Sequence, residues 1–204
     1  LGDIAKLRSV LAAAGADLAA PGVTVRDRYV FLNVQSIEAF FSGAFRAAEE
    51  ATATLEAEAN ASPLDQLGPM LMGLRHALVS GDADAVRKWD ERVNQTPTFV
   101  SRMRVNQLQY SAAARLACGD LDGAWSKASE VSSLMTPRSV GFSMSLSTKA
   151  MVLLARGENE GARATLERAV AAARELNGPA VLFPALQLLA VAEDRGDAHL
   201  YRLP

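Results

Sequence analysis

Glycines recur in this chain at an almost constant interval, and this interval constrains the possible fold more than any other feature. Successive turn glycines are separated by 38, 38, 38 and 39 residues, in the order Gly43, Gly81, Gly119, Gly157 and Gly196. A fixed period in this range is typical of a stack of similar supersecondary units rather than of one globular core. The spacing therefore predicts a chain of repeats, each of which packs against its neighbours.

The residues around the glycines predict what each repeat contains. Prolines mark the expected start of a first helix, called helix A, at Pro63, Pro97, Pro137 and Pro179. Three of these prolines follow a hydroxyl residue, Ser62, Thr96 or Thr136, which predicts an N-cap with proline at the first helical position. The glycine suits the left-handed end of helix A, and the acid that often follows suits the positive end of the next helix, helix B. Each repeat is thus expected to be an antiparallel pair of helices.

Aligning the repeats on their glycines predicts the core and the helix bounds. Apolar residues fall eleven and three residues before the glycine and five and twelve after it, a spacing that places them on one face of each helix. These residues are Leu32, Met70, Leu108, Leu146 and Ala185, then Phe40, Leu78, Leu116 and Leu154, then Ala48, Val86, Ala124 and Ala162, and finally Leu55, Val93, Val131 and Ala169. The predicted helices cover 3–18, 23–42, 44–60, 63–80, 83–95, 97–118, 121–134, 137–156, 159–177 and 180–195. Pro69 and Pro184 lie inside two of these ranges, so those helices should begin late or kink.

The repeated string Gly-Asp-x-Asp-x-Ala, with apolar residues on either side, resembles the tetratricopeptide repeat family over essentially the whole chain. This resemblance implies an all-α fold, a right-handed α-solenoid of stacked antiparallel helix pairs. It implies a single superhelical domain over residues 1–204, with about four full pairs and a truncated unit at each end. The period of 38 departs from the family's usual 34, and Leu or Met replaces its aromatic residue near the start of helix A. Long, alanine-rich repeats of this kind are similar to those of large bacterial transcriptional regulators of the LuxR type with an ATPase module, such as the maltose regulator.

Composition narrows the partners that this chain is expected to have. The net charge of −2 and the pI of about 5.8 leave no basic face for a duplex, so the segment itself is expected not to contact nucleic acid. No run of 18 uncharged apolar residues appears, so no contact with a membrane is expected. A single cysteine, Cys118, fits a reducing cytoplasm. The chain begins at Leu1 inside a predicted helix and ends just after a turn glycine, so we expect a fragment of a larger protein.

No motif predicts an enzyme. The sequence contains no P-loop, G-x-S-x-G, H-E-x-x-H or C-x-x-C pattern, and we expect no cofactor and no metal site. His76 is expected to be a surface or packed histidine. Glu49, Glu50, Glu56 and Glu58 are expected to form a solvated acidic helix face.

Binding residues are expected on helix A, because in superhelices of this family helix A lines the concave side. The candidates are Asn33, Arg75, Asn106, Gln109, Tyr110, Thr148, Met151 and Gln187. Asn106 and Gln109 are placed at the centre because buried amides demand partners and can bind the backbone of an extended peptide. The competing interpretation is that packing between repeats takes up the apolar residues of this stripe. Arg75 is the one basic residue in it, which argues against a clamp for a peptide carboxylate.

These expectations favour a ligand- or protein-binding sensor module of a bacterial transcriptional regulator, in which a protein, a peptide or a small-molecule effector binds the groove. The alternative is a protein-interaction scaffold in another multidomain protein. An ATPase P-loop before this segment and a basic helix-turn-helix after it would favour the regulator.

Overall fold

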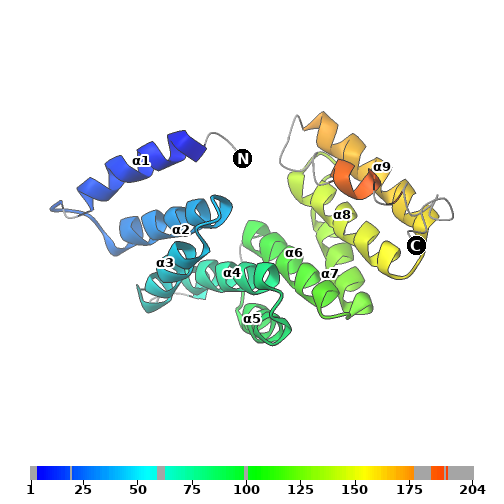
Figure 1. Ribbon diagram of the computed structural model, residues 1–204, viewed down its shortest axis with the longest axis horizontal. Helices are drawn as coiled ribbons and strands as arrows, with labels where there is room; N and C mark the ends of the chain where they lie inside the picture. The colour runs from blue at the N-terminus through cyan, green and yellow to red at the C-terminus, as the bar shows by residue number, and fades with distance from the viewer. Residues whose placement is uncertain are drawn as a thin grey trace, which may run out of the picture. The chain divides into compact units, whose positions relative to one another are not determined.

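The computed structural model describes residues 4–18, 20–58, 63–98, 101–176, 185–190 and 192, and every regular element in these ranges is helical. The predicted all-α class is confirmed. The helices are α1 (Ile4–Asp17), α2 (Val25–Phe41), α3 (Phe45–Glu58), α4 (Pro63–Ser80), α5 (Ala83–Gln95), α6 (Ser101–Ala117), α7 (Leu121–Leu134), α8 (Val140–Ala155) and α9 (Asn159–Glu175) (Figure 1). Residues 185–190 are helical as well.

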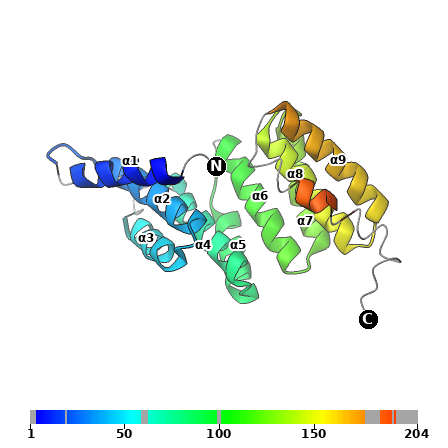
Figure 2. The ribbon, with the colours of Figure 1, turned by 45° about the horizontal axis from the view of Figure 1, so that its top comes forward.

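The chain forms two compact units, Leu1–Thr98 and Phe99–Pro204. In the first unit α2 pairs with α3 and α4 pairs with α5, while α3 and α2 both contact α4 and α1 packs on α2. In the second unit α6 pairs with α7 and α8 pairs with α9, while α7 and α6 both contact α8 (Figure 2). Each unit therefore contains two helix pairs that pack in chain order. The prediction of one superhelical domain stays a prediction.

The turn glycines end the first helix of each pair, as predicted. Gly43, Gly81, Gly119 and Gly157 all have a positive φ, between 71° and 79°. At Gly119 the backbone N–H groups of Gly119 and Asp120 donate to the carbonyls of Leu116 and Arg115, at 3.0 and 2.9 Å. This pattern is a Schellman motif, which requires a residue in the left-handed region and so favours glycine. Gly196 lies outside the described residues.

The acid after the glycine caps the second helix in two of the pairs. An oxygen of Asp82 accepts from the N–H of Ala85 at 3.0 Å, and one of Asp120 accepts from the N–H of Gly123 at 2.9 Å. Glu158 occupies the same position before α9, but its side chain makes no capping hydrogen bond. The N-terminus of α9 therefore lacks a side-chain cap of this kind, although the helix still begins at Asn159.

Two of the predicted proline starts are wrong. The hydroxyl of Thr96 donates to the carbonyl of Arg92 at 3.0 Å, so Thr96 ends α5 rather than capping the next helix, and α6 begins only at Ser101. The helix after Pro137 begins at Val140, where the hydroxyl of Ser139 accepts from the N–H of Phe142 at 3.2 Å. A hydroxyl residue before proline therefore does not by itself predict an N-cap. The hydroxyl that caps α8 is the one that accepts from the N–H three residues later.

Pro63 does begin α4, as predicted, and this helix continues through Pro69. A late start for this helix is therefore excluded. Pro179 and Pro184 lie outside the described residues.

The aligned core positions of helix B are confirmed in every repeat. The residues five and twelve positions after the glycines are at most 2% exposed: Ala48, Val86, Ala124, Ala162, Leu55, Val93, Val131 and Ala169. The helix A positions are less uniform, because Leu108, Leu146, Leu154 and Ala185 are buried while Leu32, Met70, Phe40, Leu78 and Leu116 are only partly so. Several of these partly buried residues stand in the last turn of helix A, at the end of the pair, where less chain covers them.

Candidate functional site

The predicted central residues Asn106 and Gln109 line a hollow of about 490 Å³ in the second unit. The other lining residues are Val105, Leu134, Met135, Val140, Gly141 and Met144. They come from α6, from the end of α7 and the residue after it, and from the first two turns of α8. We call this hollow the amide groove.

Close packing of α8 on α6 forms one wall of the amide groove. A Cβ on Gly141 would lie 3.2 Å from Cγ1 of Val105 and from Cε of Met135, so the first turn of α8 approaches both side chains closely. The amide of Gln109 donates from Nε2 to the carbonyl of Gly141 at 3.0 Å. The amide nitrogen of Gln109 is therefore hydrogen-bonded within the fold, which agrees with the interpretation that this stripe packs between repeats.

The amide groove combines an apolar rim with amide chemistry. None of its lining side chains is charged. Leu134, Val140 and Met144 are 52%, 48% and 43% exposed, which is high for large apolar side chains. Asn106 is half-buried beside them and carries both a donor and an acceptor. Such a surface can hold an apolar group while an amide hydrogen-bonds a polar group next to it.

The remaining predicted residues are not brought into this hollow. In the second unit Tyr110 and Met151 are half-buried on α6 and α8 without lining it. The hydroxyl of Thr148 donates to the carbonyl of Met144, 3.2 Å away in its own helix. Gln187 is exposed on the helical segment 185–190.

Two predicted residues belong to the first unit. Asn33 of α2 faces α4, since its Oδ1 would lie 3.6 Å from a Cβ on Gly68. The guanidinium of Arg75 lies over the ring of Phe40, 5.2 Å from its centroid. Burial lowers the pKa of Arg75. Both side chains thus take part in packing between helices.

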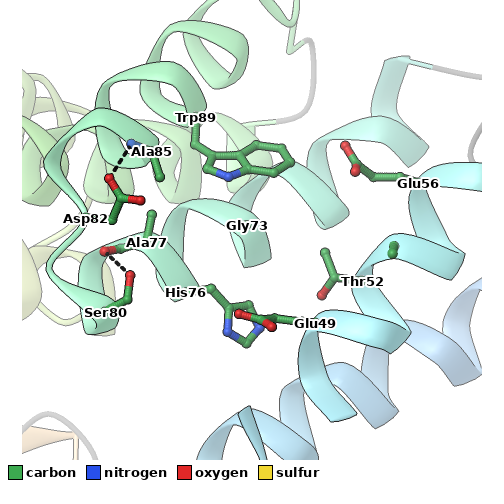
Figure 3. A pocket seen from close by; sticks show the side chains of 11 residues that line it. Glu49, Thr52, Glu56, Gly73, His76, Ala77, Ser80, Asp82, Ala85 and Trp89 are labelled. Carbon is green, nitrogen blue, oxygen red and sulfur yellow. Dashed lines mark hydrogen bonds between the residues drawn. The ribbon is translucent and has the colours of Figure 1, made fainter. Parts of the chain in front are cut away.

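A second hollow, of about 330 Å³, lies in the first unit between α3, α4 and α5 (Figure 3). Its lining residues are Glu49, Thr52, Ala53, Glu56, Gly73, His76, Ala77, Ser80, Asp82, Ala85 and Trp89. We call it the acidic hollow. The sequence reasoning missed it, because its residues come from three helices and share no motif.

Trp89 and Glu56 shape the upper part of the acidic hollow as Figure 3 draws it. The indole of Trp89 lies against the backbone of α4 at Gly73, and the guanidinium of Arg92 lies over the ring, 4.3 Å from its centroid. Nη2 of Arg92 also pairs with Oε1 of Glu56 at 2.8 Å. The expectation of a freely solvated Glu56 is wrong, because this carboxylate is half-buried and held in an ion pair with α5.

His76 closes the opposite side of the acidic hollow. Its ring packs edge-on against Phe40, 5.2 Å between centroids. Among the described residues Nε2 of His76 is buried and has no hydrogen-bond partner. Burial is the main cause that lowers the pKa of His76; the charge of Glu49 opposes this shift and the charge of Arg75 adds to it. The imidazole is therefore neutral at pH 7.

Neither a scan against protein-family models nor a search of curated proteins finds a match to this chain. Within the described ranges no group of three or more His, Cys, Asp or Glu residues is placed to hold a metal ion. No helix there is both long enough and apolar enough to span a bilayer.

Proposed function

We propose that this chain is a binding module built as a right-handed α-solenoid of the tetratricopeptide type, with a structural period of about 38 residues. Three features support the proposal. The positive-φ glycines recur at residues 43, 81, 119 and 157. The helices pack in consecutive pairs, and in each unit the first helices of its two pairs touch, α2 with α4 and α6 with α8. Contacts of this kind let successive A helices share one continuous face.

The amide groove carries the proposed binding function. It places Asn106 and Gln109, two side chains of the helix A stripe, beside the exposed apolar residues Val140 and Met144. An apolar side chain of a protein or peptide, or the apolar part of a small-molecule effector, would enter the hollow and be hydrogen-bonded by Asn106. A flexible Met at such a surface adapts to ligands of different shape.

The proposed context is a cytoplasmic transcriptional regulator of the bacterial LuxR type. A ligand in the groove would shift the equilibrium of neighbouring ATPase and DNA-binding modules if it binds one of their states more tightly. The resemblance of the repeats supports this context. The alternative is a scaffold that binds a protein partner without a switch. In either case the segment acts by binding, with no catalytic step of its own and no direct contact with nucleic acid.

The binding site is tested by selecting peptides from a random library on the immobilised chain and measuring their Kd by titration calorimetry. We expect Asn106→Ala and Met144→Ala each to weaken binding by about 1–3 kcal/mol. Arg163→Ala is the matched control, because Arg163 is an exposed residue of α9. Circular dichroism checks that helicity is unchanged. Binding that depends on Arg163 and ignores Asn106 and Met144 would place the working face on helix B and contradict the proposal.

Two further measurements test the proposed context and the proposed lack of contact with nucleic acid. The complete reading frame decides between regulator and scaffold, since a P-loop before the segment and a basic helix-turn-helix after it support the regulator. Fluorescence anisotropy with a labelled DNA duplex tests the proposal that the segment does not bind nucleic acid. Micromolar binding with a steep salt dependence near 0.1 M salt would contradict it.

A further inference from the structure

The acidic hollow presents carboxylates without a matching cation among its lining residues. Glu49, Glu56 and Asp82 contribute three carboxylates, and no Lys or Arg belongs to the lining. His76 does not compensate, because burial keeps its imidazole neutral at pH 7. Arg92, outside the lining, pairs with Glu56, and Asp82 caps α5, so the carboxylate that favours a positively charged occupant is that of Glu49.

The chain already binds one guanidinium at the rim of this hollow. Arg92 is held there by the carboxylate of Glu56 at 2.8 Å and by the ring of Trp89 at 4.3 Å from the centroid. A carboxylate and an aromatic face are the two groups that recognise a guanidinium most effectively. The contacts of Arg92 with Glu56 and Trp89 thus show that residues of this hollow can hold a guanidinium group.

A second set of acceptors in the hollow is not used in this way. Glu49 precedes Glu56 by seven residues on α3, so both lie on the same face, about 10 Å apart along the helix axis. Among the residues that the structure describes, Glu49 makes no ion pair and no hydrogen bond, and Nε2 of His76 has no hydrogen-bond partner. A neutral imidazole nitrogen can accept a hydrogen bond. Figure 3 shows Glu49 and His76 on the same side of the hollow, opposite Trp89.

The other polar groups of the hollow are engaged elsewhere. The hydroxyl of Thr52 donates to the carbonyl of Ala48 at 2.7 Å, and that of Ser80 donates to Ala77 at 3.0 Å. Asp82 accepts from two backbone N–H groups at the start of α5. The side chains of the hollow that are not engaged in this way are the carboxylate of Glu49 and the imidazole of His76.

We propose that the acidic hollow binds an organic cation, a guanidinium or alkyl-ammonium group, between the carboxylate of Glu49 and the imidazole of His76. Guanidinium and ammonium groups carry only donors, which matches the carboxylate of Glu49, an acceptor-only group. A volume of about 330 Å³ admits a group of the size of an arginine side chain. This site lies in the first unit and is separate from the amide groove.

The direct test titrates the 204-residue chain with N-acetyl-arginine amide and follows the imidazole signals of His76 by NMR. The chain has two histidines, so a His199→Gln background leaves His76 as the single reporter. N-acetyl-citrulline amide is the matched neutral probe, because it replaces the guanidinium with a urea of nearly the same shape. We expect saturable shifts with the arginine probe and none with the citrulline probe. Equal binding of both probes, or no saturation at millimolar concentration, would overturn the proposal.

The chain offers a close control for the carboxylate. Glu49→Gln and Glu50→Gln remove the same charge from adjacent positions of α3, but Glu50 pairs with Arg46 and does not line the hollow. We expect Glu49→Gln to weaken binding at least about tenfold, the loss of a charge-assisted hydrogen bond, and Glu50→Gln to leave it within about twofold. Equal losses in both variants would mean general charge attraction and no site.

A pH series tests the role of the histidine. The charges of Glu49 on α3 and Arg75 on its own helix act on the pKa of His76, and Asp82 at the start of α5 lines the same hollow. Protonation removes the acceptor and adds a like charge, so affinity should fall as the pH is lowered through the pKa of His76. His76→Gln should remove this pH dependence. Agmatine, titrated in parallel with N-acetyl-arginine amide, shows whether a free guanidino-amine or the arginine side chain of a peptide is preferred. An affinity whose pH dependence is the same in the unsubstituted chain and in His76→Gln would contradict a position next to His76.

Discussion

The indole of Trp89 lies so close to Gly73 that a Cβ on the glycine would be 2.5 Å from Cε2 and Cζ2 of the ring. No ordinary contact of a Cβ is this short, so the absence of a side chain at Gly73 is what allows α5 to place its tryptophan on α4. The guanidinium of Arg92 also lies over the ring, 4.3 Å from its centroid, so the indole contacts both the backbone of α4 and a guanidinium. The acidic hollow owes its shape to this contact.

Gly73→Ala should therefore lower the free energy of unfolding by about 1–3 kcal/mol, the usual cost of overpacking. Gly161→Ala is the control, because its nearest neighbour would be Cδ1 of Leu153 at an ordinary 3.6 Å. Alanine there should raise the free energy of unfolding by up to about 1 kcal/mol through its higher helix propensity. Urea unfolding measures both, and a stabilised Gly73→Ala variant would contradict the packing described.

Ala162→Leu should cost about 1–3 kcal/mol of unfolding free energy. Ala162 is 0% exposed and packs in a cluster with Ala150, Leu154 and Leu166. Ala164, two residues later on α9, is exposed, so Ala164→Leu should change the urea midpoint little. If the two variants unfold at the same urea concentration, the close approach at Ala162 is not a determinant of stability.

The sequence predicted the helices well where a backbone requirement forced the residue. A left-handed helix end needs glycine, and Gly119 and Gly157 stand where it is needed. Small residues at a helix contact, such as Ala124 and Ala162, follow from the same alignment. The proline rule failed because Thr96 can hydrogen-bond backward to α5 as readily as forward, and only the structure shows which carbonyl it meets.

The candidate site was predictable only in part. Periodicity placed Asn106 and Gln109 on the face that lines the amide groove, because residues three apart share a helix face. It did not predict that Gln109 would bond the carbonyl of Gly141, since that contact depends on where α8 begins. It also missed the buried amide of Gln107, whose Oε1 accepts from Arg104 at 3.0 Å. Contacts between helices depend on rotation and offset, which a single-helix pattern does not contain.

His76 should make stability depend on pH in a defined direction. Its pKa in the folded chain is lowered, mainly by burial, so the unfolded chain binds more protons between the folded pKa and the unfolded value of about 6.5. The stabilisation is present above the unfolded pKa and is lost as the pH falls toward the folded pKa. His76→Gln should flatten this part of the profile, whereas His199→Gln serves as the histidine control. Urea midpoints from pH 5 to 8 measure the effect, and identical profiles for both variants would contradict it.

A side chain one methylene shorter than that of Glu158 should cap the N-terminus of α9. Glu158 stands at the N-cap position without a capping hydrogen bond, whereas the shorter Asp120 reaches the N–H of Gly123 at 2.9 Å at the corresponding position. Glu158→Asp should therefore supply the missing acceptor and raise the free energy of unfolding by about 0.5–1 kcal/mol. Asp120→Ala should lower it by about 1 kcal/mol or more, because Asp120 also pairs with Arg115 at 2.9 Å.

Both variants keep the turn glycine and the helix bounds, so urea unfolding followed by circular dichroism compares the caps alone. Glu160→Asp, two residues further into α9, makes the same chemical change away from the N-cap and should not stabilise the chain. Because Glu→Asp keeps the charge, an equal gain for Glu160→Asp and Glu158→Asp would mean that Asp is favoured throughout the first turn and not through an N-cap hydrogen bond. A gain at Glu158 alone would show that the acid after the turn glycine acts through its hydrogen bond, as it does at Asp82 and Asp120.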